Sequence, residues 1–172
     1  GLSKTGFSAA DTLIELGAKV RVFAKGADSE TKELLDVIGG ELVESDTDIE
    51  SFNEFDPELV ITSPGFAPNH PLISRCSELG IEVWTDVDLA WRLRDKQPNA
   101  KWLTVTGTNG KTTTVELVTH ILNTAGKKAV ACGNIGNPIL NPLREPVEYV
   151  FFVVELSSFQ LHYISELSAN TS

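Results

Sequence analysis

The stretch that most constrains this chain runs from Trp102 to Val115 and reads W-L-T-V-T-G-T-N-G-K-T-T-T-V. It passes from a β-rich run through a glycine loop into an amphipathic run typical of a helix. Gly107 and Gly110 permit backbone angles that other residues avoid, so that successive N–H groups can turn inward and form an anion-binding nest. A helix that begins near Lys111 adds unpaired N–H groups and a partial positive charge at its amino end. The stretch therefore predicts a polyphosphate site.

This pattern is a partial P-loop. The full signature is G-x-x-x-x-G-K-[ST], and Val105 stands where its first glycine belongs. The remaining G-x-x-G-K-T also occurs in plain strand-to-helix turns, where glycine serves geometry and the lysine is solvated. The β-rich run before the loop and the amphipathic run after it favour phosphate binding. The residues that we predict to bind ATP are Gly107, Thr108, Asn109, Gly110, Lys111, Thr112 and Thr113.

A carboxylate completes the predicted site. The most strand-like run of the chain, Tyr149 to Val154, is apolar throughout, as in a central strand covered on both faces, and it ends at Glu155. A carboxylate at the end of the strand beside a P-loop is a usual second anchor for Mg²⁺. We predict that Thr112 and Glu155 bind the metal and that Lys111 and Glu155 are catalytic, with ATP and Mg²⁺ as cofactors. A solvated glutamate at a strand end is the alternative.

Repeated β-then-α patterns before the loop predict a parallel, doubly wound α/β sheet. The polar stretch from Asp95 to Lys101 contains one proline and is typical of an interdomain linker. We therefore expect a Rossmann-like parallel-sheet domain at residues 1–97 and part of a P-loop ATPase α/β domain at residues 98–172. The acidic stretch 44–56 is interpreted as a connector, and the stretch 141–148 as irregular.

Charge and hydropathy exclude several functions. The chain has 14 basic and 24 acidic residues, a net charge of −10, which argues against a broad surface for nucleic acid or anionic lipid. No apolar run approaches the roughly 18 residues that a membrane helix needs.

The two cysteines, Cys76 and Cys132, fit no metal-ligand spacing, and we expect both to be free thiols. We expect the protein to be cytoplasmic and monomeric. Since the chain opens on a glycine loop without Met, we expect it to be a fragment.

Three segments resemble the Mur ligases of peptidoglycan synthesis: G-T-N-G-K-T-T at 107–113, G-N-I-G at 133–136 and E-L-S-S-F-Q-L at 155–161. The first is shared with folylpolyglutamate synthetases and indicates the superfamily alone. The third is similar to the corresponding segment of the members that add D-glutamate. S-P-G at 63–65 and the turn at residues 1–6 resemble the first domain of the same enzymes.

The resemblance implies ATP-dependent addition of D-glutamate to UDP-N-acetylmuramoyl-L-alanine through an acyl phosphate, with these two small molecules as partners and no nucleic acid or membrane. It implies that the uridine diphosphate is contacted by Thr5, Ser63, Pro64 and Gly65, and the muramoyl-alanine end by Asn134, Ser157 and Gln160. Ala24 stands where the family often has an acidic uracil contact, so that contact does not carry over. The D-glutamate site would lie beyond Ser172, and we expect the fragment by itself to be inactive.

Two other functions stay open at this point. One is a different Mur ligase or a folylpolyglutamate synthetase-like ligase, which would use another acceptor. The other is a nucleotide-sugar-binding homologue without turnover. A hydrolase is disfavoured, because no G-x-S-x-G elbow surrounds the serine pair Ser157 and Ser158.

Overall fold

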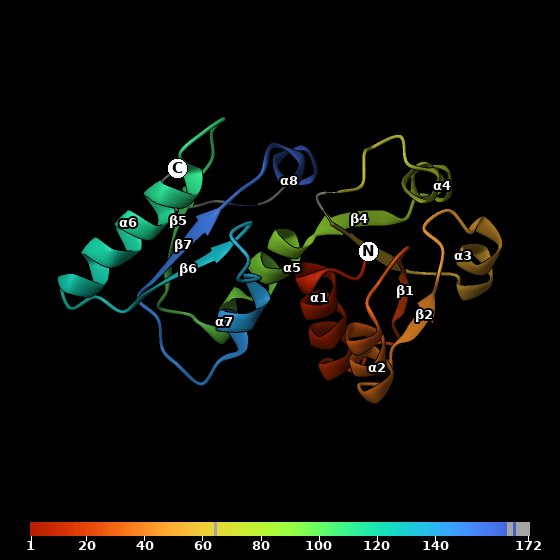
Figure 1. Cartoon of the computed structure of the whole chain (residues 1–172), viewed down its shortest axis with the longest axis horizontal. Helices are drawn as coiled ribbons and strands as arrows, with labels where there is room; N and C mark the ends of the chain where they lie inside the picture. The colour runs from red at the N-terminus through yellow and green to blue at the C-terminus, as the bar shows by residue number, and fades with distance from the viewer. Residues whose placement is uncertain (64, 165–166, 168–172) are drawn as a thin grey trace. The chain divides into compact units, whose positions relative to one another are not determined.

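The computed structural model describes residues 1–63, 65–164 and 167 (Figure 1). The chain divides into two compact units, Gly1–Asp86 and Val87–Ser172, and each is described by itself. Both units are α/β with parallel strands, which confirms the predicted fold class. The domain boundary expected between residues 97 and 98 falls inside the second unit. The assignment of separate functions to residues 1–97 and 98–172 stays a prediction. No helix in the described ranges is long and apolar enough to cross a bilayer.

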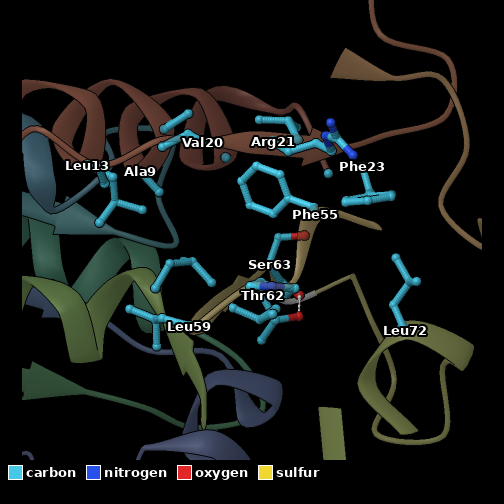
Figure 2. A pocket seen from close by; sticks show the side chains of 18 of the residues that line it. Ala9, Leu13, Val20, Arg21, Phe23, Phe55, Leu59, Thr62, Ser63 and Leu72 are labelled. Carbon is cyan, nitrogen blue, oxygen red and sulfur yellow. Dashed lines mark hydrogen bonds between the residues drawn. The ribbon is translucent and has the colours of Figure 1, made fainter. Parts of the chain in front are cut away.

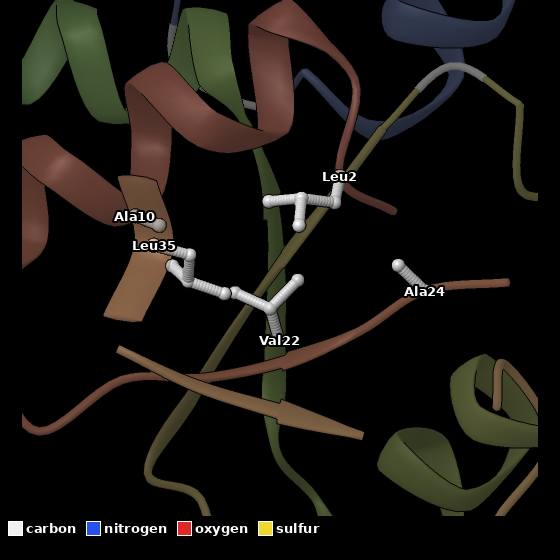
Figure 3. Packing of buried hydrophobic residues seen from close by; sticks show 5 residues of the cluster. All are labelled: Leu2, Ala10, Val22, Ala24 and Leu35. Atoms are coloured by element: carbon white, nitrogen blue, oxygen red, sulfur yellow. The ribbon is translucent and has the colours of Figure 1, made fainter. Parts of the chain in front are cut away.

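The first unit alternates helices and strands. In chain order these are α1 (Lys4–Glu15), β1 (Arg21–Phe23), α2 (Ser29–Val37), β2 (Glu41–Val43), α3 (Ile49–Phe55), β3 (Leu59–Thr62), α4 (Pro71–Leu79) and β4 (Glu82–Thr85). β1 pairs with β2, and β3 pairs with β4, each in parallel, so that two separate two-stranded sheets result. Leu2, Ala10, Val22, Ala24 and Leu35 form a buried cluster that joins α1 and α2 to β1 (Figure 3).

Helix α3 lies inside the acidic stretch that was interpreted as a connector, and that interpretation is wrong. Asp48 caps the helix, because its carboxylate accepts hydrogen bonds from the Ser51 N–H at 3.0 Å and the Ser51 hydroxyl at 2.8 Å. Phe52 is buried and packs against Phe23 with ring centroids 6.0 Å apart. A cap and one buried aromatic ring are therefore enough to hold this acidic segment as a helix.

The second unit begins at Val87, within α5 (Asp86–Arg92), and a short 3-10 helix η1 (Arg94–Lys96) follows. It continues with β5 (Lys101–Val105), α6 (Lys111–Thr124), β6 (Ala129–Gly133), α7 (Leu140–Arg144), β7 (Phe151–Glu155) and α8 (Ser158–Tyr163). The strand order β5-β7-β6 makes β7 the middle of a parallel sheet, as its apolar sequence predicts. Helix α7 contradicts the expectation of irregular backbone for residues 141–144, where burial of Leu140 and Leu143 favours the helix; residues 145–148 are neither helix nor strand, as expected.

Aromatic rings form the core of the second unit. Trp102 on β5 stacks on Phe152 of β7 with centroids 5.7 Å apart, and Trp91 of α5 meets Trp102 edge-on at 5.2 Å. Gln97 ties the segment between α5 and β5 to the entry of β7: its amide donates to the Val147 carbonyl at 2.8 Å, and its Oε1 accepts from the Tyr149 N–H at 3.2 Å. The stretch 95–101, which was interpreted as an interdomain linker, is thus hydrogen-bonded to the second unit.

Candidate active site

Three loops leave the same edge of the sheet in the second unit (Figure 1). The register pairs Val105 with Glu155 and Gly133 with Glu155, so β5, β7 and β6 end in one row. Parallel strands present their carboxyl ends at one edge, which is where α/β sheets bind ligands. The glycine loop after β5, the carboxylate that ends β7 and the G-N-I-G turn after β6 therefore meet.

The glycine loop leads directly into α6. Gly110 is the N-cap residue of this helix and has φ of +75°, a left-handed conformation that a side chain would disfavour. In the part of the chain that the structure describes, no side chain caps the first turn of α6 through a hydrogen bond. The first N–H groups of a helix have no partner within the helix, and the helix dipole is positive at this end, so this turn has the geometry that an anion would need. Phosphate binding by the loop stays a prediction.

Lys111 folds back over this loop. Its Nζ donates to the Gly107 carbonyl at 2.9 Å and lies 3.5 Å from the Thr108 carbonyl. The ammonium group is thereby held above the glycine loop, where the negative charge of a polyphosphate would arrive. Charge-assisted hydrogen bonds from an ammonium to phosphate oxygens are among the stronger polar contacts. This placement suits the role predicted for Lys111.

Glu155 is held by side chains from both neighbouring loops. Thr112 Oγ1 donates to Glu155 Oε2 at 2.6 Å, and Asn134 Nδ2 donates to Glu155 Oε1 at 3.2 Å. The glutamate is 3% exposed, and within the described ranges it takes part in no ion pair. A buried carboxylate with neutral partners is costly, so a cation at this point would stabilise it.

The donor set fits magnesium. A carboxylate and a hydroxyl from the chain, completed by phosphate oxygens and water, are the hard oxygen ligands that Mg²⁺ takes in nucleotide sites. Among the described residues, no group of three or more His, Cys, Asp or Glu side chains could hold a metal by itself. The predicted pair, Thr112 and Glu155, is brought together, and it suits an ion that shares its ligands with a nucleotide.

The turn after β6 grips the end of β7. The Asn134 N–H donates to the Glu155 carbonyl at 3.0 Å, in addition to the side-chain contact. Gly133 has φ of +96°, and a Cβ at this position would run into the Glu155 carbonyl oxygen. Asn134 was predicted as a substrate contact, and the structure places its amide on Glu155, a role that was missed.

Ser157 and Gln160, the other residues predicted to face the muramoyl-alanine end, form a capping box at the start of α8. Ser157 Oγ accepts from the Gln160 N–H at 3.1 Å, and Gln160 Oε1 accepts from the Ser157 N–H at 2.9 Å. Gln160 is 1% exposed. Both side chains thus stabilise the chain just after Glu155, and their contact with substrate stays a prediction.

The residues predicted to face uridine diphosphate belong to the first unit. Thr5 lies in the first turn of α1, Ser63 follows β3, Gly65 is exposed, and Pro64 lies outside the described residues. Thr5 and Ser63 line one cavity of about 720 Å³ (Figure 2). A Cβ at Gly6 would collide with the Gly1 carbonyl, which accounts for glycine at that position. The uridine diphosphate contact stays a prediction.

Comparison with known proteins adds independent observations. A family model described as the Mur ligase middle domain matches residues 105–171. The chain is 50% identical to the UDP-N-acetylmuramoylalanine–D-glutamate ligase of Leifsonia xyli subsp. xyli, over 96% of this chain and 34% of that protein. It is 41% identical to the protein of the same name from Streptomyces coelicolor, over 100% of this chain and 37% of that one. The chain spans about a third of the length of these curated relatives.

A solved structure is similar in fold. It is the UDP-N-acetylmuramate:L-alanyl-gamma-D-glutamyl-meso-diaminopimelate ligase from Neisseria meningitides. The TM-score is 0.55 at 19% sequence identity, and the match covers 90% of this chain and 50% of that chain. At this identity the likeness supports the arrangement of helices and strands alone.

Proposed function

Because the chain belongs to the Mur ligase family, we propose that it serves in the ATP-dependent addition of D-glutamate to UDP-N-acetylmuramoyl-L-alanine, in the synthesis of peptidoglycan precursors. The observation that carries the proposal is the meeting of the glycine loop, Thr112 and Glu155 at one sheet edge. The identity of the acceptor rests on the relatives named above. We place the activity in the cytoplasm, where ATP and nucleotide sugars are available.

In this proposal the second unit binds and orients ATP. The loop N–H groups and the amino end of α6 hold the phosphates, and Lys111 exchanges its bonds with the Gly107 and Thr108 carbonyls for phosphate oxygens. Thr112 and Glu155 would hold Mg²⁺, which when bound neutralises charge on the β- and γ-phosphates. Asn134 keeps the Glu155 carboxylate pointing at Thr112, so the ligand pair is oriented before the metal arrives.

The chemistry then needs no nucleophile from the protein. An oxygen of the substrate carboxylate forms a bond to the γ-phosphorus while the bond to the β–γ bridging oxygen breaks, which gives an acyl phosphate and ADP. The amine of D-glutamate forms the amide bond as phosphate leaves. Two anions must approach each other in the first step, and Lys111 lies where its positive charge offsets their repulsion.

Binding of Mg·ATP to the 172-residue chain tests the nucleotide part. We expect amide signals of residues 107–113 to shift, and Lys111→Ala to weaken binding by about tenfold or more, since hydrogen bonds to charged groups contribute about 1.5–3 kcal/mol. Lys127→Ala removes an equal charge from the exposed residue after the turn that ends α6, and serves as the matched control. Equal losses in both variants, or loop signals that do not move, would contradict the assignment.

Turnover tests the ligase part. The full-length enzyme should release phosphate from ATP when UDP-N-acetylmuramoyl-L-alanine and D-glutamate are both present. Release with other amino acids but not with D-glutamate would move the assignment to another ligase of the family. ATP binding without any release would favour a homologue that binds nucleotides without turnover.

A further inference from the structure

The glycine loop contains an Asn-Gly pair with a reactivity of its own. Asn109 is followed by Gly110, and no other asparagine in the sequence is followed by glycine. A backbone nitrogen that follows asparagine can attack the side-chain amide carbon and close a five-membered imide ring. Glycine permits this closure most readily, because it has no Cβ to crowd the ring and adopts many backbone angles. The pair therefore marks a place where the chain can modify itself.

The structure leaves both members of the pair free to react. Asn109 and Gly110 are exposed and lie in neither helix nor strand, since α6 begins at Lys111. Among the residues that the structure describes, no hydrogen bond engages the Asn109 side chain or the Gly110 N–H. The amide carbon of Asn109 can therefore turn toward the following nitrogen without breaking a contact.

The other described asparagines are held away from the same reaction. The side-chain amide is hydrogen-bonded in Asn53, Asn123 and Asn134. Proline, which has no N–H, follows Asn137 and Asn141. Asn69 and Asn99 each precede a residue whose N–H already donates to a backbone carbonyl. Sequence and structure thus single out the asparagine of the glycine loop.

The surroundings of Gly110 favour the first chemical step. Its nitrogen must lose a proton before it attacks, and a nearby positive charge stabilises the resulting anion. Gly110 is the N-cap residue of α6, so its nitrogen lies at the positive end of the helix dipole. The Lys111 ammonium lies over the same loop, 2.9 Å from the Gly107 carbonyl oxygen. The proton is therefore lost more easily here than at an ordinary exposed amide.

We propose that Asn109 is a site of spontaneous deamidation, which places a carboxylate in the glycine loop and which bound polyphosphate suppresses. The Gly110 nitrogen forms a bond to Asn109 Cγ, and the bond from Cγ to the side-chain nitrogen breaks. Ammonia leaves with the proton that the backbone nitrogen gave up. Water then opens the imide at either carbonyl, so that the product is an aspartyl or an isoaspartyl residue. No oxidant or reductant takes part.

The new carboxylate changes how the loop meets an anion. Lys111, which follows the pair directly, then has a competing partner within the loop. The negative charge also repels phosphate, and like charges about 4 Å apart near a protein surface repel strongly enough to weaken binding about tenfold or more. Phosphate oxygens on the loop N–H groups, that of Gly110 included, would in turn prevent ring closure. This consequence rests on the proposed function, whereas the ring closure does not.

Storage of the 172-residue chain at mildly alkaline pH tests the proposal. Conversion is followed by mass spectrometry of peptides and by labelling with an isoaspartyl methyltransferase. We expect Asn109 to be converted about tenfold or more faster than Asn99, the internal control, because the Ala100 N–H must first leave its hydrogen bond to the Gln97 carbonyl. With Mg·ATP at about 100 times its dissociation constant, conversion of Asn109 should slow about 100-fold, since only the free protein then reacts.

Two variants separate the chemistry from its effect. Asn109→Asp reproduces the aspartyl product and should bind Mg·ATP about tenfold or more weakly than Asn109→Gln. The thermal midpoint of the second unit should not fall in Asn109→Asp, because an acidic side chain is favourable at the amino end of a helix. Asn109→Gln has to close a larger ring, so its affinity for Mg·ATP should stay constant during storage while that of the unchanged chain declines.

Conversion of Asn109 no faster than that of Asn99 would overturn the proposal. An unchanged rate in the presence of Mg·ATP that shifts the amide signals of the loop would overturn it as well. If Mg·ATP shifts none of these signals, the proposed ligase function fails, and the protective effect of polyphosphate fails with it. The rate at Asn109 relative to Asn99 still decides whether the loop is a deamidation site, so the two failures are distinguishable.

Discussion

Replacing Gly133 by alanine should damage the candidate site through the backbone. Gly133 ends β6 opposite Glu155, its φ is +96°, and an added Cβ would meet the Glu155 carbonyl oxygen. The left-handed conformation costs a residue with a side chain about 1–2 kcal/mol. Forcing an extra carbon against packed backbone adds about 1–3 kcal/mol. We therefore expect Gly133→Ala to lower the free energy of unfolding by about 2–5 kcal/mol.

Gly136 is a matched control in the same turn. Its φ is +86°, and no described atom outside its own neighbours lies within 4 Å of the Cβ position. Gly136→Ala should therefore show the backbone strain alone, about 1–2 kcal/mol. Both substitutions reduce the freedom of the unfolded chain equally, so that effect cancels in the comparison. The difference in the free energy of unfolding between the two variants therefore gives the cost of placing a Cβ against the end of β7.

Urea unfolding followed by tryptophan fluorescence checks this expectation. Trp91 and Trp102 report on the second unit, and a Trp84→Phe background removes the signal of the first unit. Gly133→Ala should also weaken Mg²⁺-dependent ATP binding more than Gly136→Ala does, because the Glu155 carboxylate moves with its backbone. Equal destabilisation by the two substitutions would refute the reasoning.

Three further predictions follow from other contacts. Gln97→Ala should lower the free energy of unfolding of the second unit by about 1–3 kcal/mol in urea, because it leaves backbone groups at the entry of β7 without their partner. Hydrogen bonds from first-turn backbone N–H groups lower the pKa of Asp28 and of Asp48 below 3.8. The stabilisation is complete above about pH 4 and disappears as the pH falls through the lower native pKa, so the double Asp→Asn variant should show a shallower loss of Tm between pH 5 and 2. Burial, followed by the hydrogen bond to Glu145, raises the pKa of Tyr149 to about 12. The neutral phenol should therefore stabilise the folded state below pH 10, and this stabilisation should fade as the pH rises through about 12. Tyr149→Phe should remove the tyrosine ionisation near pH 12 from an absorbance titration.

The phosphate loop and its carboxylate were predictable because each is encoded locally. A glycine loop between a β-rich run and an amphipathic run marks the first, and the apolar run that ends at Glu155 marks the second. The meeting of Asn134 with Glu155 was not predictable in the same way. It depends on β6 and β7 being neighbours, and no local pattern gives the order of strands in a sheet.

Two helices were missed for a different reason. In α3, acidic residues hide the apolar positions Ile49, Phe52 and Phe55, although Asp48 before them is a typical N-cap residue. In α7, Pro142 within the helix argues against a helical pattern, and burial of its leucine neighbours outweighs that preference. Local composition was misleading where packing decided the conformation.

The common row formed by Val105, Glu155 and Gly133 makes the candidate site sensitive to insertions and deletions. Adding or removing one residue within β7 would turn the carboxylate to the opposite face of the sheet, because side chains alternate along a strand. The same change in the stretch 145–150, ahead of β7, can be absorbed before pairing begins. Anyone who transplants this loop into another parallel sheet must therefore transfer the alignment of the strand ends together with the glycine motif.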